Sequence, residues 1–163
     1  MEEAIAANPT FRFSSRSPLL FLARHRGVVE MKLLLEGGAF VDSRDSHGLT
    51  PLLWACRSGD LAVARLLVEH GADVDLQNEY GESALMTSAG SCWPAGNEIM
   101  ELLLERGASV GLLNNHGDSA LSLAAESGNV AAVQLLLGRG APLHGHENAE
   151  SVLQLARRGK QAD

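Results

Sequence analysis

The fold is decided by the six-residue stretch Leu67-Val68-Glu69-His70-Gly71-Ala72, because close variants of it occur four times in the chain. The other copies are LLEGGA at 34–39, LLERGA at 103–108 and LLGRGA at 136–141. The glycine before the final alanine is at positions 38, 71, 107 and 140, so successive copies are 33, 36 and 33 residues apart. A stretch that returns at a nearly fixed period indicates a repeat protein, in which one structural unit stacks on the next.

Each copy is preceded by a second recurring stretch, which predicts the start of a helix. The four openings are SPLL at 17–20, TPLL at 50–53, SALM at 83–86 and SALS at 119–122, and a partial fifth is SVLQLA at 151–156. A Ser or Thr hydroxyl can cap a helix, and Pro or Ala is well tolerated in the first turn. The sequence therefore predicts units made of a helix, a tight turn, a second helix and an extended finger.

The residues between the two stretches fit this pattern, and the second unit is an example. Gly59 ends its first helix, and Asp60 can cap its second helix, in which Val63, Leu66 and Leu67 recur with helical spacing. Equivalent residues in later units are Ile99, Leu102, Leu103, Gly128 and Asn129. No single unit has enough apolar surface to fold alone, so the units are expected to bury a shared core by stacking.

This pattern resembles the ankyrin repeat, a 33-residue unit with the motif T-P-L-H-x-A near its start. The best match is Gly48-Leu49-Thr50-Pro51-Leu52-Leu53-Trp54-Ala55, and the resemblance extends over about residues 17–158. It implies an all-α solenoid of helix-turn-helix pairs joined by β-hairpin-like fingers, whose concave face of finger tips and first helices binds other proteins. The expected boundaries are an N-terminal tail or cap at 1–16, repeats at about 17–46, 47–79, 80–115 and 116–149, and a partial C-terminal capping repeat at 150–163.

The chain departs from the family pattern in four places. Other residues replace the histidine of the motif, namely Leu20, Leu53, Met86 and Ser122, and the hydrogen bonds of that histidine are expected to be lost. Glu30 stands where later repeats have an apolar residue, as in an atypical capping unit. The third repeat carries three extra residues within 90–97, and the last unit stops at Asp163 after one predicted helix. That end fits a C-terminal cap, a fragment or a short isoform.

Composition excludes several classes of protein. The chain has 163 residues, of which 45% are apolar and 20% are charged, as expected of one globular domain or a short repeat array. Its net charge of −7 repels phosphate, so neither nucleic acid nor an anionic membrane is an expected partner. The N-terminus lacks the basic and apolar segments of a signal peptide, and no apolar run is long enough to span a membrane. We expect a monomer in the cytoplasm that also reaches the nucleus by diffusion.

The sequence contains no motif that indicates an enzyme, a cofactor site or a metal site. Phosphate-binding and nucleophile-elbow glycine motifs are absent, and the periodic glycines are explained by helix ends. His144 and His146 lack the further ligands that a metal site needs. Cys56 lies in a helix where a small apolar residue is expected, so we predict a core thiol. Cys92 lies in the insertion and leaves a reactive thiol open as an alternative.

The resemblance places candidate partner-binding residues at the finger tips and on the exposed side of the first helices. They are His47, Leu49, Arg57 and Ser58 in repeat two, Tyr80, Glu82 and Trp93 in repeat three, and His116, Asp118 and Glu126 in repeat four. Tyr80 and Arg57 belong to the residue types that most often dominate interface energetics. Carboxylates gather in repeats three and four, so the expected partner presents a basic patch toward them and an acid or a carbonyl toward Arg57.

The aromatic residues leave alternatives open. Trp93, in the inserted loop, either contacts a partner or folds back and fills a gap at the edge of the solenoid. Trp54 falls on a helix face that is expected to meet the neighbouring repeats, so it is predicted to be a core residue. Phe11 and Phe13 either cap the first repeat or belong to a short tail.

The repeat and the lack of catalytic motifs predict a non-enzymatic scaffold or adaptor that binds another protein on its concave face. An alternative is the targeting module of a longer regulatory protein, for example a ubiquitin-ligase receptor, which the abrupt end at Asp163 favours. A thiol-based redox switch or enzyme at Cys92 is the third alternative. Iodoacetamide labelling would identify it, because a catalytic thiolate reacts faster than an ordinary thiol.

Overall fold

The computed structural model describes residues 17–25, 27–91, 93, 95–143, 152–154 and 157, and the structural statements below concern these residues. Eight helices follow one another in pairs, and residues 152–154 and 157 are also helical. The pairs are α1 (Pro18–His25) with α2 (Val28–Glu36), α3 (Pro51–Ser58) with α4 (Leu61–Glu69), α5 (Ala84–Ala89) with α6 (Gly96–Glu105), and α7 (Ala120–Glu126) with α8 (Val130–Gly138). The described ranges contain no β-strand, so the fold is all-helical.

Short polar side chains cap α3, α4, α5, α7 and α8, as the sequence predicts, whereas α2 and α6 begin without a side-chain cap. The Thr50 hydroxyl accepts a hydrogen bond of 3.2 Å from the Leu53 N–H, and the Asp60 carboxylate accepts one of 3.2 Å from the Val63 N–H. The same role is taken in α5, α7 and α8 by Ser83, Ser119 and Asn129. These side chains satisfy backbone N–H groups that have no partner within the first turn of a helix.

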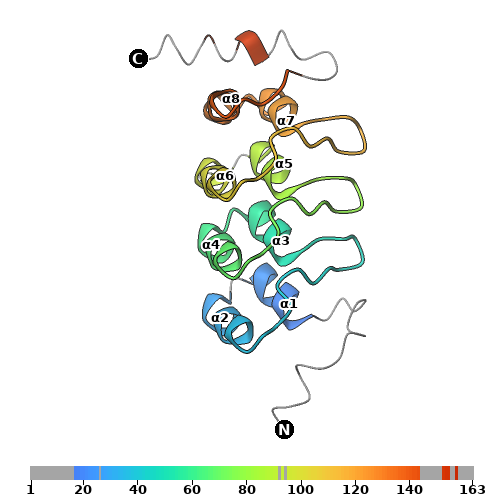
Figure 1. Ribbon diagram of the computed structural model, residues 1–163, viewed down its shortest axis with the longest axis vertical. Helices are drawn as coiled ribbons and strands as arrows, with labels where there is room; N and C mark the ends of the chain where they lie inside the picture. The colour runs from blue at the N-terminus through green and yellow to red at the C-terminus, as the bar shows by residue number, and fades with distance from the viewer. Residues whose placement is uncertain are drawn as a thin grey trace.

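The helices stack in two columns, with α1, α3, α5 and α7 in one column and α2, α4, α6 and α8 in the other (Figure 1). Each helix packs against its pair partner and against the equivalent helix of the next pair. The core is continuous along the stack, and Met31, Leu67, Leu103 and Leu136 are among its fully buried side chains. The expectation of stacked units with a shared core is therefore confirmed.

The glycine of each repeated stretch ends the second helix of its pair. These glycines have left-handed backbone, with φ of +83° at Gly38, +81° at Gly71, +84° at Gly107 and +76° at Gly140. The residue after Gly71 then bonds back to the helix, from the Ala72 N–H to the Leu67 carbonyl at 3.0 Å. Only glycine adopts this conformation without a steric penalty, which explains why the stretch is repeated so closely.

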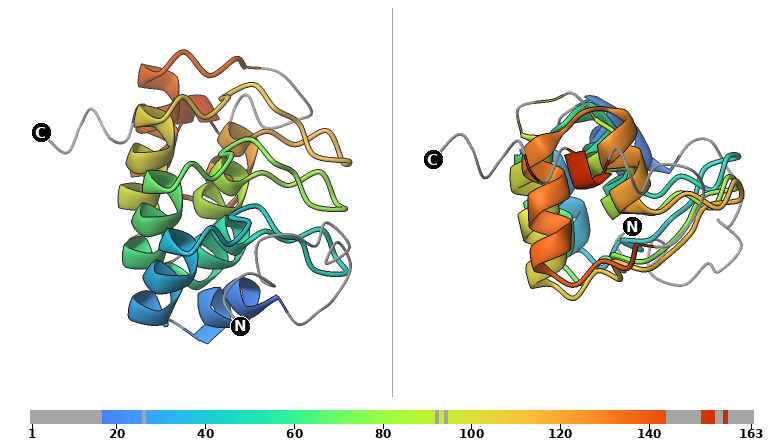
Figure 2. Two further views of the ribbon diagram at one scale, coloured as in Figure 1. Left: turned by 60° about the horizontal axis from the view of Figure 1, so that its bottom comes forward. Right: turned by 90° about the horizontal axis from the view of Figure 1, so that it is seen from above.

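The fingers project from the helical columns in one direction (Figure 2). Their arms are not strands, which differs from the expected β-hairpin character. The finger between α2 and α3 leads into the second repeat and is called the second finger. Its arms share one backbone hydrogen bond, from the Asp45 N–H to the Leu49 carbonyl at 3.1 Å. The Gly48 N–H closes the turn by donating to the Asp45 carbonyl at 3.1 Å. Two such bonds close a turn but do not make the alternating ladder of a sheet.

The extra residues of the third repeat lengthen the connection between α5 and α6. The equivalent turn after α3 contains Gly59 with a φ of +65°, whereas Gly90 after α5 has a φ of −80° and the chain continues outward. The Ser91 hydroxyl donates to the Ser88 carbonyl at 2.8 Å, and α6 then begins at Gly96. Trp93 is carried by this connection.

Both ends of the stack expose apolar side chains, and Leu143 and Leu153 are those near the C-terminal end. The first repeat exposes Glu30, as expected of a terminal unit, but also four apolar side chains, which are Phe21, Val29, Leu33 and Phe40. Near the other end Val152 is buried against the core. Phe11 and Phe13 lie outside the described residues, as do His144 and His146.

Candidate functional site

A side-chain oxygen shapes the tip of each finger. In the second finger, one carboxylate oxygen of Asp45 accepts hydrogen bonds from the N–H groups of His47 and Leu49, both at 2.9 Å. The amide oxygens of Asn78 and Asn114 accept the equivalent pairs of bonds in the next two fingers. Asp and Asn favour such turns because their short side chains reach the backbone two residues ahead. The three tips therefore have the same geometry.

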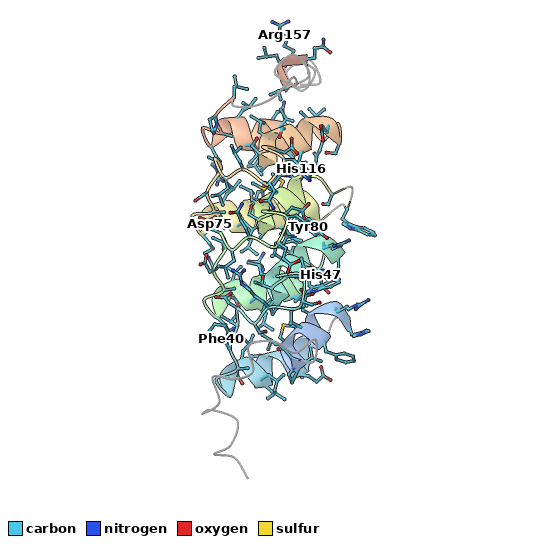
Figure 3. The ribbon with its side chains drawn as sticks, turned by 90° about the vertical axis from the view of Figure 1, so that its right-hand side faces the viewer. Phe40, His47, Asp75, Tyr80, His116 and Arg157 are labelled. Atoms are coloured by element: carbon cyan, nitrogen blue, oxygen red, sulfur yellow. The ribbon has the colours of Figure 1, made fainter. Side chains whose placement is uncertain are left out.

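The turns place three predicted site residues in one row. His47, Tyr80 and His116 lie one above another along the stack and are exposed (Figure 3). Adjacent tips are bonded through the backbone, from the Glu79 N–H to the His47 carbonyl at 3.2 Å and from the Asn115 N–H to the Tyr80 carbonyl at 2.9 Å. Tyr80 keeps 56% of its surface exposed. We call His47, Tyr80 and His116 the tip row, in which three ring-bearing side chains stand on tips whose backbones are bonded to one another.

The residue that follows the turn glycine points inward, which corrects the prediction for Leu49. Leu49 is only 7% exposed and packs in the core, because the chain here turns from the finger back into α3. Glu82 and Asp118 occupy the same repeat position and are half-buried. Their carboxylates accept hydrogen bonds from the side-chain amides of Asn78 at 2.8 Å and Asn114 at 3.3 Å. Both carboxylates therefore stabilise the turn of the finger to which they belong.

The ends of the first helices supply a second set of exposed residues. Arg57 at the end of α3 and Glu126 at the end of α7 are exposed. Ser58 is half-buried, and its hydroxyl donates to the Ala55 carbonyl at 3.2 Å, so it offers little to a partner. The structure thus places Arg57 and Glu126, but not Ser58, where a partner can reach them.

Trp93 both packs locally and stays exposed. Its indole N–H donates to the Arg57 carbonyl at 3.1 Å, which joins the inserted connection to the end of α3. Its Cβ and Cγ lie 2.9 Å from where a Cβ on Gly59 would be, so the indole crosses Gly59 in close contact. More than half of the side chain, 56%, nevertheless remains exposed. Folding back therefore does not hide the ring.

Trp54 is not the core residue that the sequence predicts. It is half-buried, and its indole N–H donates to the second carboxylate oxygen of Asp45 at 3.1 Å. The guanidinium carbon of Arg24 lies 5.1 Å from the centroid of the indole ring, and that of Arg57 lies 5.9 Å away. The prediction failed because Trp54 lies on the outer side of the first helices. There its ring meets long polar side chains of α1 and α3 rather than the second helices.

Sequence reasoning missed Arg24, because it assigned no site residues to the first repeat. The repeat period alone could have identified this residue, since Arg24 precedes Arg57 by 33 positions and occupies the same place in its helix. Gly90 and Glu126 hold this place in the third and fourth repeats. Along the column the position therefore changes from two arginines to a glycine and then to a glutamate.

The described residues contain no group of three or more His, Cys, Asp or Glu side chains that could hold a metal ion. Cys56 is fully buried, and burial raises the pKa of its thiol to about 12, against a smaller opposite effect of the neighbouring Ser88. A thiol with so high a pKa is not ionised at neutral pH and is a poor nucleophile. Cys92 lies outside the described residues, so the structure does not address the alternative placed there. No helix in the described ranges is long and apolar enough to cross a membrane.

Comparison with known families gives the same result as the geometry. The family model for ankyrin repeats, described as three copies, matches residues 5–78 and 70–147, which together span most of the chain. No match was found among curated proteins. The paired helices stack through a shared core, and the fingers point to one side, over the same residues that the family model matches. The chain belongs to the ankyrin repeat family.

Proposed function

We propose that this chain is a non-enzymatic scaffold or adaptor that binds a partner protein on the tip row and the exposed ends of the first helices. Ankyrin repeats are typically protein-binding modules. The observation that carries the proposal is the tip row, in which His47, Tyr80 and His116 have the same rigid turn and remain exposed. A surface whose backbone is held in place before binding loses less conformational entropy when a partner arrives.

The charges on this surface suggest how a partner is oriented. Exposed carboxylates lie in the later repeats, at Glu79 and Glu126, whereas Arg57 lies in the second repeat. Complementary charges mainly speed encounter and set the orientation of a complex. The partner is therefore proposed to present basic groups toward repeats three and four. The chain is proposed to act as a monomer in the cytoplasm and, by diffusion, in the nucleus, without a cofactor.

Proximity labelling in cells, with the chain fused to a labelling enzyme, tests this function. A double variant, Arg57→Ala with Tyr80→Ala, removes two exposed side chains of the proposed surface. The matched control is Arg65→Ala with Glu101→Ala, which removes two exposed side chains from the second helices α4 and α6. Proteins labelled by both wild type and control but lost with the surface variant support the proposal. Equal labelling by all three proteins contradicts it.

A further inference from the structure

The most distinctive surface feature beyond the tip row is a cluster at the start of the first-helix column. Arg24 of α1 and Arg57 of α3 lie against the ring of Trp54, at 5.1 and 5.9 Å from its centroid. Both arginines are exposed, and Trp54 is half-buried between them and the core. We call these three residues the arginine–tryptophan patch. Trp93 borders it through the hydrogen bond from its indole to the Arg57 carbonyl.

We propose that the arginine–tryptophan patch binds an acidic segment of the partner protein, through carboxylates that pair with Arg24 and Arg57. The proposal rests on the proposed function and names the chemistry of the partner at one end of that surface. It concerns the first two repeats, whereas the carboxylates of the surface lie in repeats three and four.

The guanidiniums of Arg24 and Arg57 lie near the Trp54 ring on exposed residues, where a partner can reach them. A guanidinium that stacks through its flat face keeps its N–H groups outward in the plane, where they match the two oxygens of a carboxylate. In the described part of the chain, no carboxylate lies within ion-pair distance of Arg24 or Arg57. Two cations thus lie near one indole ring with no ion-pair partner among the described residues, in a chain whose net charge is −7.

Hydrogen bonds fix the platform under the two arginines. The Trp54 indole donates to Asp45, and the other oxygen of that carboxylate holds the tip of the second finger. The Asp45 carboxylate therefore orients the indole ring, and neither arginine lies within ion-pair distance of it. A fixed ring restricts the arginine side chains before binding, which lowers the entropic cost of pairing with a carboxylate.

Charge complementarity favours an acidic protein segment over other occupants. Nucleic acid carries a dense row of phosphates, and the excess of acidic residues in this chain repels it. An acidic segment needs only to reach the two guanidiniums, while the exposed Trp93 indole at the border offers apolar surface to the neighbouring residues of that segment. Arginine–carboxylate pairing in this form is directional and gives specificity as well as affinity.

Selection from a phage library of random dodecapeptides tests the proposal on the full chain. We expect the wild type and the control Arg65→Gln to enrich peptides rich in Asp and Glu, and Arg24→Gln with Arg57→Gln to lose that enrichment. Enrichment of neutral or basic peptides on the wild type, or of no peptide at all, overturns the proposal. Neutral peptides whose binding is lost with Tyr80→Ala overturn it while leaving the proposed function intact.

Fluorescence anisotropy with the most enriched peptide, labelled with fluorescein, gives the magnitude. Removing both guanidiniums is expected to weaken binding by about tenfold or more, and Arg65→Gln is expected to leave it unchanged. A version of the peptide with Asn and Gln in place of Asp and Glu should bind the wild type as weakly as the acidic peptide binds the double variant. Equal affinities for the acidic and amidated peptides contradict the proposal.

A variant that preserves the charges distinguishes recognition by the planar guanidiniums from simple attraction between opposite charges. It also tests the proposal if the Gln variant fails to fold. Arg24→Lys with Arg57→Lys keeps both charges but loses the planar, bidentate edges. We expect its affinity for the acidic peptide to fall between those of the wild type and the Gln variant. Affinity equal to that of the wild type would mean that the indole platform has no role, and it would overturn the geometric part of the proposal.

Discussion

At the scale of single residues, two serines of α5 make opposite contributions to stability. Ser83 caps the helix, and its hydroxyl accepts a hydrogen bond from the Met86 N–H at 3.4 Å. Ser88 is also buried, and its hydroxyl forms no hydrogen bond of ordinary geometry, although it lies next to the Cys56 thiol. We expect Ser83→Ala to lower the free energy of unfolding by about 1 kcal/mol, as loss of a cap does. Ser88→Ala removes an unsatisfied polar group, so stability should stay unchanged or rise by up to about 1 kcal/mol.

Urea denaturation of the two variants, followed by circular dichroism, checks this contrast. The variants are matched, because both remove one buried hydroxyl from the same helix. Equal losses of stability would show that the Ser88 hydroxyl is satisfied in solution, with the neighbouring Cys56 thiol as its partner.

Asp42 makes stability depend on pH through its position at the start of the second finger. Burial raises the pKa of its carboxyl most, the negative charge of Asp73 adds to this, and the hydrogen bond from the Asp73 N–H and the charge of Arg44 oppose it. Because the folded-state pKa exceeds the unfolded value of 3.8, the contribution of Asp42 is most favourable at low pH. It is lost as the pH rises through the folded-state pKa.

Replacing Asp42 by Asn should therefore stabilise the fold at neutral pH and make little difference below the ordinary pKa of a carboxyl. The amide oxygen can still accept the bond from the Asp73 N–H, so only the ionisation is removed. Thermal unfolding of both proteins between acidic and neutral pH is the measurement. A variant that is less stable at every pH would mean that the ionised carboxylate is favourable where it lies.

The sequence predicted the residues whose roles are set by their nearest neighbours along the chain. The caps at Thr50, Asp60 and Ser119 are examples, since such bonds span only three residues. It failed at Leu49 and Trp54, where the outcome depends on how the finger meets the first helix. The resemblance to the family placed Leu49 at the finger tip, but its own apolar side chain was the better guide.

At the scale of elements, buried leucines of the second helices form part of the core that joins the repeats. Leu67 of α4 and Leu103 of α6 are fully buried at equivalent positions. We expect Leu67→Ala and Leu103→Ala each to lower the free energy of unfolding by about 2–5 kcal/mol, because a cavity remains where the side chain was. Leu33→Ala is the control, since Leu33 lies on the second helix α2 but is 64% exposed.

Denaturant unfolding of the three leucine variants decides whether the buried side of these helices is assigned correctly. The control should change stability by less than about 0.5 kcal/mol, as ordinary surface substitutions do. If Leu67→Ala or Leu103→Ala lowered the free energy of unfolding by so little, the side of the helix assigned as buried would be wrong.

Substitutions in the turn between α3 and α4 test whether the inserted connection packs against this turn. Gly59 and Gly128 occupy equivalent turns with φ of +65° and +69°, but a Cβ on Gly59 would meet Trp93, whereas one on Gly128 would meet nothing within 4 Å. Both alanine variants carry the cost of left-handed backbone, about 1–2 kcal/mol. Gly59→Ala should cost about 1 kcal/mol more than Gly128→Ala, because the indole must move.

The excess cost at Gly59 should disappear when Trp93→Gly is added, because this change removes the Cβ of Trp93 as well as its ring. Chemical denaturation of the single and double variants measures it. Equal effects of the two glycine substitutions would mean that Trp93 does not rest on this turn in solution. The sequence left this contact open because the repeat period gives no template for inserted residues.

At the scale of the whole molecule, the same repeat gives the stack both its core and its surface. Positions that face the next unit are apolar in most repeats, whereas the exposed position at the end of the first helix changes from Arg24 and Arg57 to Gly90 and Glu126. The sequence alone predicted the stack, because a period of about 33 residues can be recognised without any contact information. It could not predict that two arginines share one indole, since that contact joins different repeats across the surface.

Site-specific photo-crosslinking in cells tests most directly whether this surface binds a protein. Benzoylphenylalanine would replace Tyr80 in the tip row in one variant and Arg65, exposed on α4, in the other. We expect discrete crosslinked protein adducts from position 80 and none from position 65. Adducts from position 65 alone, or the same adducts from both positions, would contradict it and place the interaction on the second helices.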